Sequence, residues 1–233
     1  MYLSTPSTDP VNYTIWPLPL SNATKITGTI DKLSPTENLV NNTDYYKILP
    51  NSDNYHVYSQ LFVSSVNAGT VTSTKGYYIE ADAPIFVNIR YNVNNQSSSF
   101  VSKGEAALGK SFRTGGFTNG TPADDNYLNF ASVMAVEAGT TTVTFSDINN
   151  NAGNGFADME NIAEVYDGSG NINDIEITLN QFETFVVATR APRSGSINNN
   201  ATPGHPYPIT NRDALIGMLI ESDKNIAVIS GGA

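Results

Sequence analysis

The residue types best suited to chemistry in this sequence are the oxygen-bearing side chains of one acidic segment. The segment runs from Asp147 to Asp158, and Asn149 and Asn151 alternate with its first carboxylate. Hard cations such as Ca²⁺ bind carboxylate and amide oxygens, and a short loop with a carboxylate at each end is typical of a calcium site. The glycine expected at the sharp turn is displaced by one position, and Asp158 stands where a bidentate glutamate is usual.

Further oxygen ligands follow this segment at Asp167, Asn171 and Asp174. A solvated acidic loop between two strands explains the same residues, because Asn, Asp and Gly favour turns. We prefer that interpretation and assign no metal-ligating residue. Calcium stays a hypothesis for the acidic loop 146–174. A melting temperature that a chelator leaves unchanged would contradict it, since a ligand bound only by the folded state raises stability.

The nucleophiles and bases of the chain form no catalytic pattern. The two histidines, His56 and His205, are far apart in the sequence, and there is no cysteine, so neither a zinc nor a copper site is predicted. Ser194-Gly195-Ser196 is not a nucleophile elbow, and there is no glycine-rich phosphate loop. We therefore predict no enzyme, with no catalytic and no cofactor-binding residue. A glycoside hydrolase is a minor alternative, because the 22 acidic residues give no identifiable catalytic pair.

Aromatic side chains at strand ends or in loops are the remaining candidates for binding. Rings in such places form binding platforms for proteins or glycans, or they pack beneath loops. Packing is the commoner arrangement and is preferred here, whereas a platform would make binding depend on Trp16 or Tyr207. The candidates are Trp16, Tyr45, Tyr46 and Tyr207.

Charge and composition exclude two classes of partner. The net charge of −10 repels phosphate backbones, so nucleic-acid binding is not expected. No apolar run is long enough for a membrane-spanning helix. The absence of cysteine means that no disulfide stabilises the fold, which must depend on core burial. The N-terminal residues lack the features of a signal peptide.

Short strands must position these residues. Thr, Val, Ile and Tyr alternate between clusters of Asn, Gly and Pro, and this pattern is typical of many short strands joined by turns. Ile85, Val87 and Ile89, for example, would lie on one face of a half-buried strand. The sequence therefore predicts an all-β fold.

Two phrases of the sequence occur twice. Ile79-Glu80-Ala81-Asp82 resembles Ile220-Glu221-Ser222-Asp223, and an apolar strand follows each. Tyr13-Thr14-Ile15 resembles Val143-Thr144-Phe145. The copies lie about 130 residues apart at the opening phrase and about 141 at the closing one, so we predict an internal duplication.

Local turn signals give an expectation for how these strands pair. The polar residues Ser222 to Asn225 indicate a tight turn, so the closing phrase is expected to be a hairpin. Glu137 to Thr140 indicates a turn between two further strands, so the opening phrase is also expected to be a hairpin.

The predicted fold is two related β-sandwich-like units with long Asn/Gly-rich loops, residues 1–100 and 101–233. The second unit begins with a strand at Phe130 to Val136, preceded by a strand at Leu108 to Arg113, for which the first unit has almost no equivalent. We therefore expect the first unit to lack its leading strand, and an unfilled sheet edge is a template for pairing. We also expect residues 1–233 to be part of a longer chain that has neighbouring domains.

Four segments of the chain resemble the IgGFc-binding protein N-terminal domain family, in order and in spacing, over most of residues 75–233. The opening residues Tyr2 to Val11 are similar to copies in large surface proteins of Bacteroidetes, which often carry a gliding-motility-type sorting domain for type IX secretion. The family has no catalytic motif, and neither a leading strand of the first unit nor a sorting domain is found here. The segments are Ala107 to Phe112, Ser132 to Phe145, Ile177 to Phe185 and Ile220 to Gly231.

The resemblance implies a non-enzymatic extracellular module of a cell-surface or secreted adhesin. Such a module binds a cell-surface protein or glycan, or acts as a structural spacer. The alternative from another class is a carbohydrate-binding module of a polysaccharide-degrading enzyme, which glycan binding that depends on Trp16 or Tyr207 would favour.

Overall fold

The computed structural model describes residues 1–30, 46–47, 60–61, 63, 67–93, 96–116, 129–148, 174–189 and 214–232. These residues are organised in antiparallel sheets, so the prediction of an all-β fold is confirmed. No helix in the described ranges is both long and apolar enough to cross a membrane.

The chain divides into two compact units. Unit 1 comprises Met1–Phe62 and Thr74–Ala107, and unit 2 comprises Val63–Ser73 and Leu108–Ala233. The chain thus leaves unit 1, contributes a short segment to unit 2 and returns. The domain bounds 1–100 and 101–233 stay a prediction.

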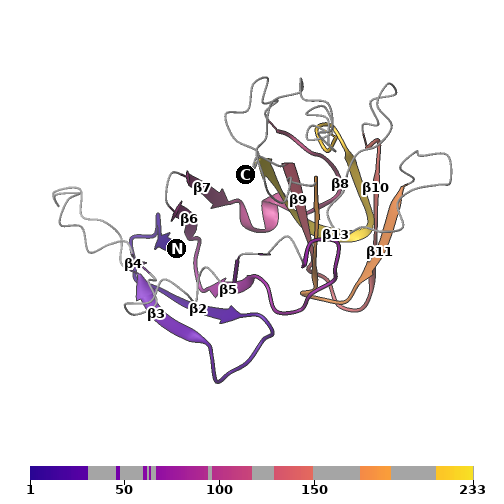
Figure 1. Ribbon diagram of the computed structural model, residues 1–233. Helices are drawn as coiled ribbons and strands as arrows, with labels where there is room; N and C mark the ends of the chain where they lie inside the picture. Colours follow the sequence, from indigo (N-terminus) through magenta and orange to yellow (C-terminus); the bar gives the residue numbers. More distant parts are fainter. Residues whose placement is uncertain are drawn as a thin grey trace, which may run out of the picture. The chain divides into compact units, whose positions relative to one another are not determined.

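Unit 1 contains two antiparallel sheets (Figure 1). One has the strand order β3–β2–β5 and the other the order β4–β1–β6–β7. The strands are β1 (Tyr2–Ser4), β2 (Val11–Pro17), β3 (Ile26–Ile30), β4 (Tyr46–Lys47), β5 (Tyr77–Ala81), β6 (Phe86–Val93) and β7 (Gln96–Ser102).

Alternate residues of both sheets supply the core of unit 1. Tyr13 and Ile15 of β2 are buried together with Leu3 of β1 and Val87 of β6. Because one cluster draws side chains from both sheets, the sheets face each other as in a β-sandwich. The opposite face of β2, with Asn12, Thr14 and Trp16, is turned away from this core.

Unit 2 has the strand order β11–β10–β13–β9–β12, and β8 also pairs with β13. Its apolar core includes Val133, Phe145 and Ile220, all of which are fully buried. A short 3₁₀ helix, η3 (Gly104–Ala107), precedes β8 in the sequence. The strands are β8 (Gly109–Arg113), β9 (Asn129–Ala135), β10 (Thr141–Ser146), β11 (Ile175–Leu179), β12 (Thr184–Ala188) and β13 (Leu219–Gly232).

The expectation of a hairpin at the closing phrase is wrong. Residues Leu219–Gly232 form one continuous strand, β13, which is yellow in Figure 1. Its first half pairs with β10 and its second half with β9. The register on β8 shifts between Glu221 and Ile226, so the polar residues form an irregularity within a strand and not a turn.

The expectation of a hairpin at the opening phrase is also wrong. β9 and β10 are consecutive in the chain, but they do not pair, because β13 lies between them in the sheet. In unit 1 the consecutive strands β1 and β2 belong to different sheets, as do β5 and β6. In each case the turn carries the chain to a new set of partners instead of folding one strand back onto its neighbour.

In each unit, one aspartate side chain accepts a hydrogen bond from the neighbouring strand close to the point where the chain changes its strand partner. The Oδ1 atom of Asp82 accepts a hydrogen bond of 2.8 Å from the backbone N–H of Asn12. In unit 2 the Oδ1 atom of Asp223 accepts one of 2.9 Å from the backbone N–H of Thr142. A second carboxylate, Glu137, accepts the N–H of Asn225 at 3.0 Å. These side chains satisfy backbone donors at a point where a regular ladder is interrupted.

The repeated phrases have the same pairing register in the two units. Ile15 pairs with Ile79, and Phe145 pairs with Ile220. Leu3 pairs with Val87, and Val133 pairs with Val228. The strands β1, β2, β3, β4 and β5 thus correspond in pairing to β9, β10, β11, β12 and the first half of β13. This agreement supports the internal duplication, which stays a prediction.

Residues 67–73 act as a strap on the edge strand β12. Thr72 exchanges backbone hydrogen bonds with Thr184 at 2.9 and 2.8 Å, and the N–H of Gly69 donates to the carbonyl of Val186 at 2.8 Å. Ala68 is only 4% exposed. The strap therefore satisfies backbone groups at an edge that would otherwise present them for pairing.

Candidate functional site

Most of the candidate residues identified from the sequence lie outside the described ranges. Only the backbone of Tyr46 is described, in β4. Trp16, Asp147 and Asp174 are described with their side chains. The candidates outside the described ranges are His56, His205, Tyr45, Tyr207, Ser194 to Ser196, Asn149, Asn151, Asp158, Asp167 and Asn171.

Asp147, the first carboxylate of the acidic loop, has a basic partner. Its Oδ2 atom lies 2.6 Å from Nη1 of Arg113, and both side chains are 57% exposed. The same guanidinium donates to the carbonyl of Gly217 at 2.8 Å. Within the described ranges no three His, Cys, Asp or Glu side chains are grouped so as to hold a metal ion. The calcium hypothesis stays a prediction, and a cation there would compete with Arg113 for this carboxylate.

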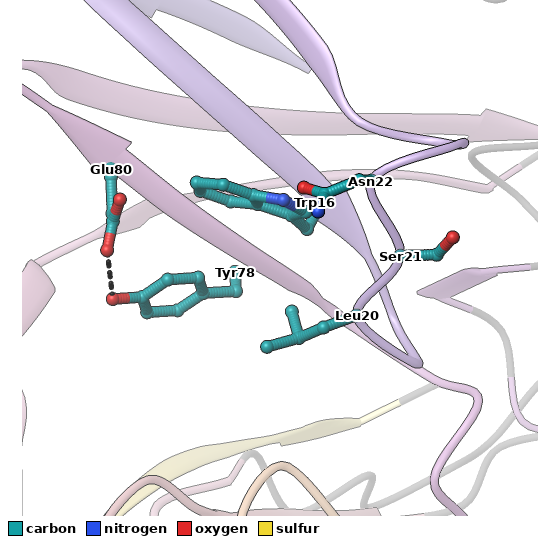
Figure 2. A pocket seen from close by; sticks show the side chains of 6 residues that line it. All are labelled: Trp16, Leu20, Ser21, Asn22, Tyr78 and Glu80. Atoms are coloured by element: carbon teal, nitrogen blue, oxygen red, sulfur yellow. Dashed lines mark hydrogen bonds between the residues drawn. The ribbon is translucent and has the colours of Figure 1, made fainter.

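Trp16 lies in an open hollow on the outer face of the sheet β3–β2–β5. Because Ile15 points into the core, Trp16 points away from it, and Tyr78 of β5 stands directly opposite in the ladder. The ring centroids are 5.6 Å apart, and the ring planes are inclined at 35°. Figure 2 shows the two rings beside each other, with the segment Leu20 to Asn22 close to them. Both rings are half-buried, although neither belongs to the core cluster.

A carboxylate completes this aromatic pair. The phenol of Tyr78 donates a hydrogen bond of 2.6 Å to Oε1 of Glu80, as the dashed line in Figure 2 shows. The two side chains are two residues apart on β5, so the strand geometry places them on the same face. The hydrogen bond to Glu80, followed by burial and the negative charge of Glu80, raises the pKa of Tyr78. The phenol is therefore held in its protonated form as a donor.

The hollow has a volume of about 270 Å³ and a mixed lining. Trp16, Tyr78 and Leu20 supply apolar surface, and Leu20 is 46% exposed. Ser21, Asn22 and Glu80 supply polar groups at the rim. Apolar walls with a few polar groups are typical of small-ligand sites, and this volume is near the lower end of their range. The chemistry suits a single sugar ring, whose C–H face can stack on an aromatic ring while its hydroxyls bond to the rim.

The hollow offers no pair of carboxylates. Glu80 is the single acidic residue among the described residues that line it. Hydrolysis of a glycosidic bond ordinarily needs two carboxyl groups on either side of the bond. The arrangement of the described residues therefore fits binding of a ligand better than its cleavage.

The sequence pointed to Trp16 but not to Tyr78 or Glu80. Glu80 belongs to the repeated closing phrase, which we interpreted as a structural element, and Tyr78 directly precedes it. The signal was present in the alternation: Tyr78 and Glu80 are on the opposite face from Ile79, just as Trp16 is on the opposite face from Ile15. What the sequence lacked was the pairing register that places Tyr78 opposite Trp16.

A comparison with protein families gives a match over more than half of the chain. The model of the family described as IgGFc binding protein matches residues 97–233. The chain belongs to the IgGFc binding protein family. No curated protein and no solved structure matches it.

The family match and the hollow lie in different parts of the chain. The segment matched to the IgGFc binding protein family begins within β7 and includes all the strands from β8 to β13. The residues that line the hollow all precede that segment: Trp16, Leu20 to Asn22, Tyr78 and Glu80. Membership of the IgGFc binding protein family therefore says nothing about the hollow, which rests on its own geometry.

Proposed function

We propose that this protein is a non-enzymatic extracellular module of a cell-surface or secreted adhesin, which binds a protein or glycan partner or spaces other modules apart. The observation that carries this proposal is the match of residues 97–233 to the IgGFc binding protein family. The all-β architecture and the low content of charged residues, 15%, are compatible with it. The resemblance to large surface proteins of Bacteroidetes extends the proposal to export by type IX secretion.

Localisation of the natural gene product tests the compartment. Antibodies against residues 1–233 should stain intact cells, and protease added outside should remove the signal. A cell lysed before staining gives the matched control for total protein. Staining that appears only after lysis would contradict an extracellular role.

Direct binding tests the partner class. Purified residues 1–233 are passed over immobilised IgG Fc, over extracellular-matrix and cell-surface proteins and over a glycan array, because the name of the family refers to IgG Fc. An adhesin should bind at least one surface saturably, without altering the ligand. Turnover of a glycan, abolished when a carboxylate is replaced, would instead support an enzyme.

The aromatic hollow favours a second candidate function, a carbohydrate-binding module. The observation that favours this second candidate is the outward-facing pair Trp16 and Tyr78, with Glu80 at the rim of the hollow. Trp16→Ala should weaken binding to any glycan found on the array by at least tenfold, because the stacking surface is lost. Thr14→Ala, on the same face of β2 but outside the hollow, is the matched control. Equal glycan binding by both variants would exclude the hollow as the binding site.

A further inference from the structure

The sheet β3–β2–β5 of unit 1 ends at the strand β5. The corresponding strand segment of unit 2 has a paired strand on both sides. In unit 2 the first half of β13 lies between β10 and β8. In unit 1 the corresponding strand, β5, pairs with β2 on one side, and no described strand pairs with its other side. The correspondence is fixed by register, since Ile79 pairs with Ile15 as Ile220 pairs with Phe145.

The backbone groups at this edge can be assigned from the ladder. The N–H of Asp82 donates to the carbonyl of Asn12 at 3.1 Å, and the N–H of Leu18 donates to the carbonyl of Gly76 at 3.2 Å. In an antiparallel pair, successive residues direct their backbone groups to alternate sides. Ile79 and Ala81 therefore direct their N–H and C=O groups away from β2, toward the edge.

In unit 2 the strand β8 occupies the corresponding edge, and its side chains indicate which side chains an added strand on β5 would need. Phe112 of β8 stands opposite Ile220 and packs against the core of unit 2. Ile79, the counterpart of Ile220, is partly buried against the core of unit 1. An added strand would accordingly place a large apolar side chain opposite Ile79 and extend that core.

Charge complementarity also favours a partner of the β8 type. β8 contains Lys110 and Arg113 and no acidic residue, and the Nζ atom of Lys110 donates to the carbonyl of Asp223 at 2.8 Å. The acidic residues Glu221 and Asp223 of β13 have their counterparts in Glu80 and Asp82, both exposed. In unit 2 Lys110 bonds a main-chain carbonyl and Arg113 pairs with Asp147, so both contacts go to groups other than these two carboxylates. In unit 1 the exposed acidic groups on and next to β5 create a negative potential, which favours a strand that carries basic residues.

We propose that the outer edge of β5 binds an extended strand of a partner protein by antiparallel β-augmentation, in the register that β8 adopts on β13. The strand would carry a large apolar or aromatic residue opposite Ile79, with basic residues near it. Main-chain hydrogen bonds to Ile79 and Ala81 supply affinity, and the side chain over Ile79 supplies specificity. The backbone groups of Ile79 and Ala81 lie outside the lining of the aromatic hollow, although Glu80 contributes both to the rim of the hollow and to the negative charge of this edge.

A synthetic peptide with the sequence of residues 108–114, Leu-Gly-Lys-Ser-Phe-Arg-Thr, is the probe. Fluorescence anisotropy of the labelled peptide with the protein of residues 1–233 should show saturable binding with one peptide per protein. The same peptide with Phe112→Glu should bind at least tenfold more weakly. Absence of saturable binding by the first peptide would overturn the proposal.

Proline substitutions locate the binding edge. Ala81→Pro removes one outward N–H of β5 and should weaken binding of the peptide at least tenfold. Thr27→Pro is the matched control, because the same alternation directs the N–H of Thr27 outward at the opposite edge of this sheet, on β3. It should leave binding of the peptide within about twofold, provided that tryptophan fluorescence shows both variants folded. Trp16→Ala should also leave it unchanged, which separates this proposal from glycan binding in the hollow.

Hydrogen exchange provides a readout that needs no variant. The amides of Ile79 and Ala81 should gain protection when the peptide binds, whereas those of Ile220 and Ser222 should not change. Saturable binding without added protection of Ile79 and Ala81 would show that the peptide binds elsewhere and would overturn the proposal. A dimer that Ala81→Pro dissociates, together with no binding of the peptide, would show that the edge pairs with a second copy of the chain and would also overturn it.

Discussion

Gly28 of β3 lies opposite Tyr13 of β2 in the sheet of unit 1. A Cβ atom at this position would lie 2.7 and 2.9 Å from ring carbons of Tyr13, which is 2% exposed. Such distances are closer than van der Waals contact, so the ring or the strand would have to shift. The absence of a side chain at Gly28 is therefore what lets Tyr13 lie across the ladder.

We predict that Gly28→Ala lowers the free energy of unfolding by about 1–3 kcal/mol, the usual cost of overpacking a core. Gly115→Ala is the control, because nothing lies within 4 Å of a Cβ atom there. Urea denaturation monitored by circular dichroism measures both. Equal losses for the two variants would show that the contact with Tyr13 is not the cause.

Ionisation of Tyr77 is expected to make the free energy of unfolding depend on pH in the alkaline range. Burial raises the pKa of its phenol from 10.0 to about 12. The folded state therefore holds this proton more tightly than the unfolded state, so the stabilisation is fully present below pH 10 and is lost as the pH rises toward 12. We predict that the free energy of unfolding falls across this interval and that Tyr77→Phe reduces the fall. Urea denaturation at pH 9, 10, 11 and 12 measures it, and identical pH profiles for both proteins would refute the assignment to Tyr77.

At the scale of elements, Asp82 and Asp223 hold the points where the chain changes its strand partners. Each accepts a hydrogen bond from a backbone N–H of the neighbouring strand. We predict that Asp223→Ala lowers the free energy of unfolding by about 1 kcal/mol, the usual net value of one hydrogen bond. Asp82→Ala should lower it by about 2 kcal/mol, because Asp82 also accepts a bond of 2.8 Å from Nδ2 of Asn12. Asp223→Asn keeps the acceptor oxygen and should cost less, whereas Asp82→Asn keeps one acceptor and turns an amide donor toward Nδ2 of Asn12. Glu176→Ala, an exposed carboxylate on β11, is the control, and an equal loss there would count against a specific role for the two aspartates.

The strands themselves could be predicted from the sequence. Val11, Tyr13 and Ile15 alternate with polar residues, and β2 buries these three side chains. Ile175, Ile177 and Leu179 show the same pattern, and β11 lies there. Alternation is a local property of an extended chain with one buried face, so it is visible in the sequence before any partner is known.

The pairing of the strands could not be predicted in the same way. Ser222 to Asn225 resembles a hairpin turn, because Ser, Asp and Asn favour turns wherever the chain bends. Whether the following strand returns to its predecessor or joins another partner depends on long-range contacts, here with β10 and β9. For the same reason Trp16 was a candidate from the sequence, whereas its partner Tyr78 became evident only from the register of β2 on β5.

At the scale of the whole molecule, the strap of residues 67–73 makes unit 2 depend on a segment that lies in the sequence between two parts of unit 1. We predict that Ala68→Asp lowers the free energy of unfolding of unit 2 by more than about 2 kcal/mol, because it buries a carboxylate. Val71→Asp introduces the same side chain at a position that is 42% exposed and should cost about 0.5 kcal/mol or less. Differential scanning calorimetry compares the two, and similar melting curves would mean that the strap does not stabilise unit 2.

The interleaved path of the chain also has a consequence for inheritance. No single cut in the polypeptide separates unit 1 from unit 2, because residues 63–73 belong to one unit and the residues on both sides of them belong to the other. A genetic exchange that transferred residues 97–233 alone would take β7 away from its ladder with β6 and leave behind the bonds from Gly69 and Thr72 to β12. The two units are therefore expected to be gained, lost and shuffled together, as one evolutionary module.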